Sequence, residues 1–125
     1  MLLAEDDGGI RQAMAELLQD EGYDCIVAEH GRAALDILSR QMPSLLLIDL
    51  LMPIMNGVEL IARVRRDPRW SDVPMVVMTA AGDRIIGVDV QSLNVPVLRK
   101  PVEIGSLVQV LARQSEAAVE RREAR

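Results

Sequence analysis

Aromatic residues are nearly absent from this chain. Phe does not occur, and Tyr23 and Trp70 are the only aromatic residues among the 125. Seven methionines can fill the interior in their place, because the Met side chain is flexible enough to pack irregular gaps. The net charge is −5, and the arginine clusters at 63–69 and 121–125 have no aromatic residues interleaved with them. We therefore predict that these arginines form solvated helix faces and that the chain does not bind nucleic acid directly.

Cysteine and long apolar runs are also scarce. Cys25 is alone, which excludes an intrachain disulfide and fits a reducing compartment. No apolar stretch approaches the roughly 20 residues that a membrane-spanning helix needs. The segment Met1–Ala4 leads directly into acidic residues without a charged leader or a cleavage site, so no signal peptide is expected. These absences predict a cytoplasmic protein that does not contact a membrane.

Short apolar runs alternate with longer amphipathic stretches along the whole chain. The runs are rich in Leu and β-branched residues and lack polar alternation, which is typical of strands buried on both faces. The expected strands are Leu2–Asp6, Tyr23–Ala28, Leu45–Asp49, Val73–Thr79 and Val95–Arg99. The expected helices are Ile10–Asp20, Ala33–Arg40, Val58–Arg66, Arg84–Leu93 and Ile104–Ala112. Five strands alternating with five helices predict a doubly wound α/β sheet with right-handed crossovers.

The apolar pattern decays after Ser115 into a tail of Glu, Arg and Ala with a single Val. We expect one domain over residues 1–113, with 114–125 as a fraying, charged helical extension or the stub of a linker. No DNA-binding helix-turn-helix and no catalytic output segment follow in this sequence. The chain is therefore expected to be a stand-alone domain or one cut from a larger protein.

Polar residues follow four of the five expected strands. Glu5 and Asp6 end the first, Asp49 ends the third, Thr79 ends the fourth, and Lys100 follows the fifth. In an open α/β sheet, ligands bind beyond the carboxyl ends of the strands, so we expect these side chains to converge at one edge.

Such a cluster suits a particular chemistry. Neighbouring carboxylates repel unless they share a proton or bind a cation, and oxygen ligands without His or Cys favour Mg²⁺. A carboxylate beside Mg²⁺ can accept a phosphoryl group, whose equatorial oxygens need cationic and hydroxyl donors. We therefore predict Asp49 as the nucleophile, Glu5 and Asp6 as metal ligands, and Lys100 and Thr79 as the groups that hold the phosphoryl oxygens.

Five segments together resemble the signatures of bacterial response-regulator receiver domains, including the chemotaxis receivers. They are Leu3–Asp7, Leu47–Pro53, Asn56-Gly57, Val77–Ala80 and Lys100-Pro101, and the resemblance extends over about residues 1–113. It implies a five-stranded flavodoxin-like sheet in the order 2-1-3-4-5. It also implies phosphoryl transfer to the chain from a sensor histidine kinase or a phosphotransfer protein.

The resemblance assigns roles to individual residues. Glu5 and Asp6 match the acidic metal pair, Asp49 the phosphoacceptor, and Thr79 and Lys100 the switch hydroxyl and the lysine. Leu51 matches the position whose backbone carbonyl is a metal ligand, so its apolar side chain is no objection. The resemblance further implies a cis peptide bond at Lys100-Pro101.

Some residues near these segments have simpler interpretations. We expect Asp7 to start a helix, Pro53 and Gly57 to shape the loop after Asp49, and the lone His30 to be a surface residue without a metal role. Neither Leu51 nor Ala81, two residues beyond Asp49 and Thr79, can hydrogen-bond a water, so slow loss of the phosphoryl group is expected.

The chain also departs from the family pattern. Val97 stands where receivers usually carry a Tyr or Phe that follows the switch hydroxyl, and Ser92–Pro96 replaces the usual step before the fifth strand. The downstream partner is unknown, and the face of the fourth helix, fifth strand and fifth helix is its default surface by resemblance.

Two other functions remain open. The first is a receiver-like interaction module that works without phosphorylation, although such modules usually lose at least one of the five site residues. The second is a phosphatase of the haloacid dehalogenase type, which uses an Asp nucleophile. That class needs a second Asp as general acid where this chain has Leu51, so we expect no turnover of an external substrate.

Overall fold

The computed structural model describes residues 1–80, 82 and 84–124. Five parallel strands form one sheet in the order β2-β1-β3-β4-β7. They are β1 (Leu2–Ala4), β2 (Ile26–Ala28), β3 (Leu46–Asp49), β4 (Met75–Thr79) and β7 (Val97–Arg99). This confirms the predicted flavodoxin-like order 2-1-3-4-5, with β7 as the fifth strand, although all five strands are shorter than expected.

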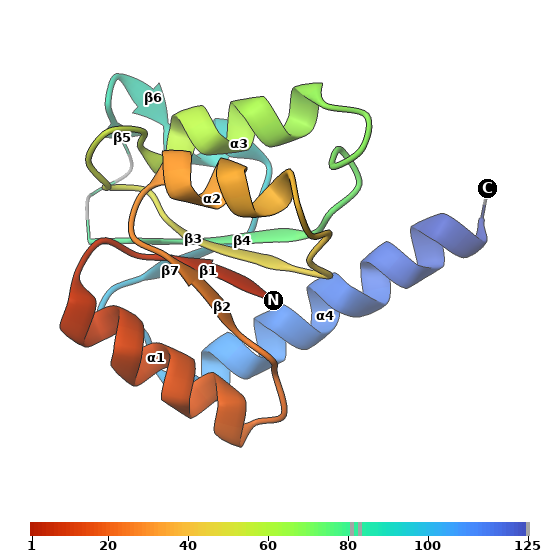
Figure 1. Cartoon of the computed structure of the whole chain (residues 1–125), viewed down its shortest axis with the longest axis horizontal. Coiled ribbons are helices and arrows are strands. Elements are labelled where there is room, and N and C mark those ends of the chain that lie inside the picture. Colours follow the sequence, from red (N-terminus) through yellow and green to blue (C-terminus); the bar gives the residue numbers. More distant parts are fainter. Residues whose placement is uncertain (81, 83, 125) are drawn as a thin grey trace.

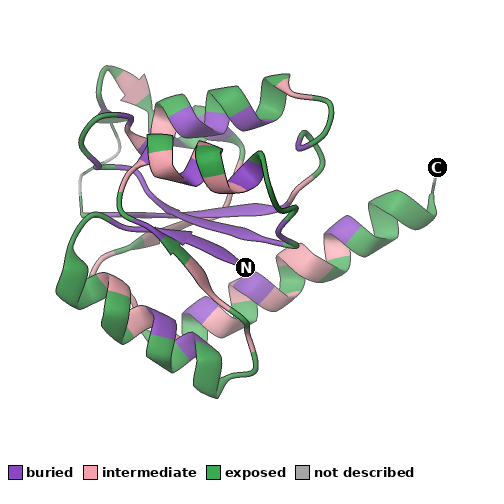
Figure 2. Cartoon of the chain, in the orientation of Figure 1, coloured by how far each residue is buried: buried purple, intermediate pink, exposed green. Residues whose placement is uncertain are grey.

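Helices cover both faces of the sheet (Figure 1). The helices α1 (Gly8–Asp20) and α4 (Ile104–Glu123) lie on one face, and α2 (Gly31–Leu38) and α3 (Gly57–Arg66) lie on the other. Each face has its own apolar core. Alternate strand residues supply the two cores, because successive side chains of a strand point to opposite faces. The central strands β1, β3 and β4 are buried throughout, the edge strands β2 and β7 are only partly buried, and the outer helix surfaces are exposed (Figure 2).

Side-chain caps mark where the helices begin. Asp7 accepts a hydrogen bond from the backbone N–H of Ile10 at 3.0 Å, as expected of a residue that starts a helix. His30 caps α2 through Nδ1, which accepts from the N–H of Ala33 at 3.0 Å. These bonds satisfy N–H groups that the first turn of a helix leaves without intrahelical partners. The lone histidine, expected to be a surface residue, is thus partly buried with a structural contact.

The helix expected over Arg84–Leu93 is wrong. That segment forms a two-stranded antiparallel hairpin, β5 (Arg84–Ile85) and β6 (Val88–Asp89), followed by the 3₁₀ helix η1 (Val90–Leu93). Ile86 and Gly87 both have positive φ angles, of 53° and 74°, which is the backbone conformation of a tight hairpin turn. The described residues therefore contain four α-helices rather than five.

The C-terminal helix includes the expected helical extension. It begins at Ile104 as expected and continues without a break past Ala112 to Glu123. Ala118 on its second half is only 4 % exposed, and Gln114 and Arg121 help to line a cavity of about 210 Å³ next to Arg65. The segment 114–123 is thus helical, and at least Ala118 within it is buried.

The only tryptophan lies just beyond the end of α3. Trp70 is 7 % exposed, and the guanidinium of Arg69 lies 4.5 Å from the centre of its ring. Arg69 also forms an ion pair with Asp67 at 2.8 Å. Among the described residues, no helix is both long and apolar enough to cross a bilayer.

Candidate functional site

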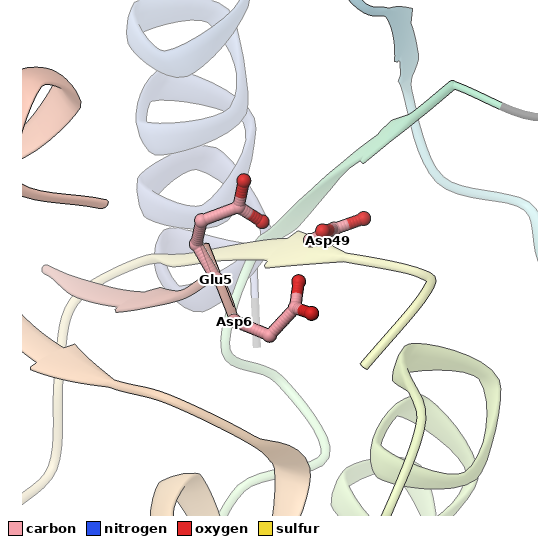
Figure 3. A group of neighbouring side chains, drawn as sticks. All are labelled: Glu5, Asp6 and Asp49. Atoms are coloured by element: carbon pink, nitrogen blue, oxygen red, sulfur yellow. The ribbon is translucent and has the colours of Figure 1, made fainter. Parts of the chain in front are cut away.

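The predicted acidic residues meet at the carboxyl edge of the sheet. Glu5 and Asp6 directly follow β1, and Asp49 is the last residue of the neighbouring strand β3. One carboxylate oxygen from each of the three lies within 4.8 Å of the others. Figure 3 shows the three side chains gathered at the ends of their strands. The sheet order creates this cluster, because neighbouring parallel strands end side by side.

Burial separates this cluster from ordinary surface charge. Among the described residues, the buried polar or charged residues are Glu5, Asp49 and Thr79, which are 0 %, 3 % and 0 % exposed. All three lie at the carboxyl edge of the sheet. Asp6 lies at the same edge, but its side chain is exposed. Charged side chains are rarely buried unless they are paired or bind a metal. The concentration of buried polar groups at one place therefore indicates a functional pocket.

Lys100 reaches into the pocket from the segment after β7. Its Nζ lies 2.6 Å from Oε1 of Glu5 and 3.1 Å from Oδ2 of Asp49, so one ammonium bridges two buried carboxylates. Its backbone N–H donates to the carbonyl of Thr79 at 3.0 Å, which joins the ends of β7 and β4. Burial lowers the pKa of Lys100, but the hydrogen bonds to Glu5 and Asp49 outweigh it and raise the pKa overall. The Lys100-Pro101 peptide bond is cis, as the family resemblance implied.

Glu5 is the most constrained of the three carboxylates. Its Oε2 is buried and has no hydrogen-bond partner among the described residues. The pKa of Glu5 is raised from 4.5 to about 8, because burial and the neighbouring Asp49 raise it by more than Lys100 lowers it. An orphaned carboxylate oxygen beside two further carboxylates fits a hard divalent cation, which prefers oxygen ligands.

The loop after β3 is fixed close to Asp49. The backbone N–H of Leu51 donates to Oδ1 of Asp49 at 3.1 Å, and the Leu51 side chain is 46 % exposed. Gly57, the first residue of α3, donates to the carbonyl of Leu50 at 2.9 Å. A Cβ at Gly57 would lie 2.7 Å from the carbonyl oxygen of Asp49, so only glycine fits there. This tight approach orients the loop that carries Leu51.

The structure bears in different ways on the other predictions, which concern Val97, Ala81 and the partner surface. Val97 is partly buried on β7 and pairs with Val77 of β4, so no aromatic ring stands at this position. Ala81 lies outside the described residues. The default partner surface that included a helix over Arg84–Leu93 does not exist in that form, because a hairpin and a 3₁₀ helix replace the helix.

Sequence reasoning missed an apolar groove beside the pocket. A hollow of about 460 Å³ lies between α1 and the segment after β7, lined by Ile10, Ala13, Met14, Leu17, Lys100, Pro101 and Val102. Ile10 and Leu17 on this side of α1 are 40 % and 48 % exposed. The signal was present in the sequence, because α1 has more apolar residues than one buried stripe requires.

Known proteins share both the sequence pattern and the fold. The family profile of the response regulator receiver domain matches residues 1–112. The chain is 31 % identical over 114 residues to the probable transcriptional regulator ycf29 of Pyropia yezoensis, covering 89 % of this chain and 50 % of that protein. The chain spans from about a third to three fifths of the length of the curated relatives it matches.

Solved structures agree with this match. The signal receiver domain of a signal transduction histidine kinase from Syntrophus aciditrophicus is 25 % identical with a TM-score of 0.85, over 93 % of this chain and 89 % of that one. The chemotaxis protein CheY4 of Vibrio cholerae is 27 % identical with a TM-score of 0.80, over 90 % and 95 % of the two chains. With this sheet order, this acidic edge and a profile match over most of its length, the chain belongs to the receiver domain family of two-component response regulators.

Proposed function

We propose that this chain accepts a phosphoryl group on Asp49 in a Mg²⁺-dependent reaction. The donor would be the phosphohistidine of a sensor histidine kinase or a phosphotransfer protein, and the phosphorylated form would alter a surface that binds a downstream protein. The observation that carries this proposal is the buried contact of Asp49 with Lys100 at 3.1 Å, beside two further carboxylates.

The chemistry follows from the position of Asp49. A carboxylate oxygen of Asp49 attacks phosphorus, an acyl phosphate forms, and the bond from phosphorus to the donor nitrogen breaks, with the electron pair remaining on that nitrogen. Lys100 already contacts Asp49 and is positioned to balance charge on a phosphoryl oxygen. Thr79 ends the adjacent strand β4 and would offer its hydroxyl to another of these oxygens.

Mg²⁺ would be held by the carboxylates of Glu5, Asp6 and Asp49 and by the backbone carbonyl of Leu51. When bound, the ion would neutralise charge on the carboxylates and on the phosphoryl oxygens. The orphaned Oε2 of Glu5 supports this assignment, because a metal ligand or a proton would satisfy it.

The phosphodonor needs a docking surface next to Asp49. The apolar groove along α1 supplies one, since Lys100 belongs both to its lining and to the acidic pocket. An amphipathic helix of the donor could cover Ile10 and Leu17 while presenting its phosphohistidine to Asp49. The output route differs from the usual one because Val97 replaces the aromatic residue, and the downstream partner is unidentified. We propose no direct contact with nucleic acid or membrane.

Incubation with acetyl phosphate and Mg²⁺, followed by intact mass spectrometry, tests the proposal. The parent chain should gain one acid-labile, hydroxylamine-sensitive phosphoryl group, and Asp49→Asn should gain none while keeping its fold. The Asn side chain has nearly the same shape, so the loss would reflect the missing nucleophile. A parent that stays unmodified would favour the phosphorylation-independent module. Continuous release of inorganic phosphate from an aryl phosphate, with Asp49-dependent turnover, would favour the phosphatase.

A further inference from the structure

One residue of α1 binds three consecutive carbonyl groups of the acidic segment. The guanidinium Nη1 of Arg11 donates to the carbonyl oxygen of Glu5 at 2.9 Å and to that of Asp6 at 3.4 Å. The backbone N–H of Arg11 donates to the carbonyl oxygen of Asp7 at 2.8 Å. Arg11 thus holds the backbone of the whole acidic run from Glu5 to Asp7.

The β-sheet ladder makes few hydrogen bonds to the backbone of this acidic segment. β1 ends at Ala4, and the last ladder contact of the segment is the N–H of Glu5 donating to the carbonyl of Ala28 at 3.0 Å. Among the described residues, no backbone N–H donates to the carbonyl of Glu5 or of Asp6. The backbone carbonyls of the two expected metal ligands Glu5 and Asp6 are therefore held by the Arg11 side chain.

Arginine suits this task for geometric reasons. Its planar guanidinium presents several N–H donors in a fixed arrangement, whereas the ammonium of Lys is a single point. The Arg11 side chain is half-buried, and within the described residues it forms no ion pair with a carboxylate. Its guanidinium lies alongside Gly8, where an added Cβ would be 3.6 Å from Nη2. The observed contacts of this cation are thus the carbonyls that precede α1.

We infer that Arg11 is a positioning residue for the acidic pair Glu5 and Asp6. It fixes the backbone from which the two carboxylates point toward Asp49, and so sets the affinity of the pocket for a divalent cation. The inference rests on the proposed Mg²⁺ site. Groups that orient metal ligands from behind typically change metal affinity by roughly 10- to 100-fold when they are removed.

Two effects of Arg11 have opposite signs, and this makes the inference testable. As a nearby positive charge, Arg11 would repel Mg²⁺, so removing it would tighten binding. As a positioning residue, it would favour binding, so removing it would weaken binding. The direction of the change therefore separates the two roles.

Isothermal titration calorimetry of the full chain with MgCl₂ is the experiment. Arg11→Gln should bind Mg²⁺ roughly tenfold more weakly than the parent. Arg66→Gln is the matched control, because Arg66 also donates from a helix to a backbone carbonyl, that of Ala62 at 3.2 Å, but at the far end of α3. Arg66→Gln should leave the Mg²⁺ affinity unchanged.

Phosphorylation kinetics give a second readout. With acetyl phosphate, Arg11→Gln should need more Mg²⁺ for half-maximal rate but should approach the parental rate at saturating Mg²⁺. If Arg11→Gln does not fold, Arg11→Lys keeps the charge and should still weaken Mg²⁺ binding. Equal or tighter binding by the folded variant overturns the inference while the proposed function stands. A parent that binds no Mg²⁺ overturns both.

Discussion

Leu51 places an aliphatic side chain next to the expected phosphoryl site. It lies two residues beyond Asp49, its N–H contacts Asp49, and its side chain is 46 % exposed. Hydrolysis of an aspartyl phosphate needs a water in line with phosphorus, and a polar side chain can hold that water in place. We expect Leu51→Asn to lose its phosphoryl group several-fold faster than the parent.

Rapid gel filtration first removes the phosphodonor and free Mg²⁺. Mg²⁺ is then added back, and the loss of the phosphoryl group is followed over time by intact mass spectrometry. Leu51→Ala is the control, because it opens the same space without a hydrogen-bonding group. Equal rates for Leu51→Asn and the parent would show that bulk water reaches phosphorus unaided.

The buried carboxyl group of Glu5 predicts a specific pH dependence of stability. Burial, with Asp49, raises its pKa from 4.5 to about 8. Between these pH values the folded state keeps a proton that the unfolded state has released. The stability that Glu5 contributes is therefore complete below pH 4.5 and is lost as the pH rises through about 8. In Mg²⁺-free buffer, the free energy of unfolding should fall across this interval.

Urea unfolding at a series of pH values measures this change. Glu5→Gln cannot release the proton, so its free energy of unfolding should vary less with pH than that of the parent. Parallel curves for the two proteins would contradict the assignment. Saturating Mg²⁺ should also flatten the parental curve, because the ion would replace the proton as the partner of the carboxylate.

At the scale of elements, sequence reasoning succeeded where burial alone decides the structure. Continuous apolar runs predicted the strands, the family resemblance implied their order, and polar residues at the strand ends predicted the acidic edge. The helix prediction over Arg84–Leu93 failed, because a turn at Ile86-Gly87 with positive φ angles reverses the chain and forms a hairpin there.

Contacts made through the backbone were also beyond prediction. The role of Arg11 depends on three carbonyl groups, and carbonyls carry no signature in the residue types. The predicted strands extended beyond the observed ones, because backbone hydrogen bonds leave no signature in the residue types. Hydrogen bonds between neighbouring chain segments, rather than side-chain hydropathy, decide where a ladder stops.

The second half of α4 offers a test of where the folded unit ends. Ala118 is 4 % exposed, whereas Val119 beside it is 42 % exposed. Ala118→Glu would bury a charge in a tight contact and should lower the free energy of unfolding by about 2 kcal/mol. Val119→Glu is the control and should change it by less than about 0.5 kcal/mol.

Chemical unfolding of the two variants, followed by circular dichroism, provides the comparison. We propose from this contact that the folded unit extends past residue 113 to include the packed turns of α4. Equal stability of the two variants would instead return the segment 114–124 to a loose helical extension.

At the scale of the whole molecule, metal binding should stabilise the fold. Three carboxylates crowd one edge, and a ligand that binds only the folded state stabilises it by mass action. At a Mg²⁺ concentration about 100-fold above Kd, the gain in the free energy of unfolding is about 2.7 kcal/mol. Thermal unfolding should therefore shift upward by several degrees.

Asp6→Ala should abolish most of this shift, because it removes one expected ligand from an exposed position and leaves both cores untouched. Asp20→Ala, at the exposed end of α1, is the matched control and should shift with Mg²⁺ as the parent does. A parental Tm that stays constant over millimolar Mg²⁺ would contradict the site.

Trp70 can report on the state of the acidic pocket through its fluorescence, because it lies at the far end of α3 from that pocket. α3 starts at Gly57, which is bonded to the loop after Asp49, and it ends shortly before Trp70 with its stacked Arg69. The helix has ten residues and is therefore about 15 Å long. The indole emission thus comes from the opposite end of α3 from the carboxylates. An emission change on phosphorylation would record motion transmitted along this helix, free of direct quenching by an ion in the pocket.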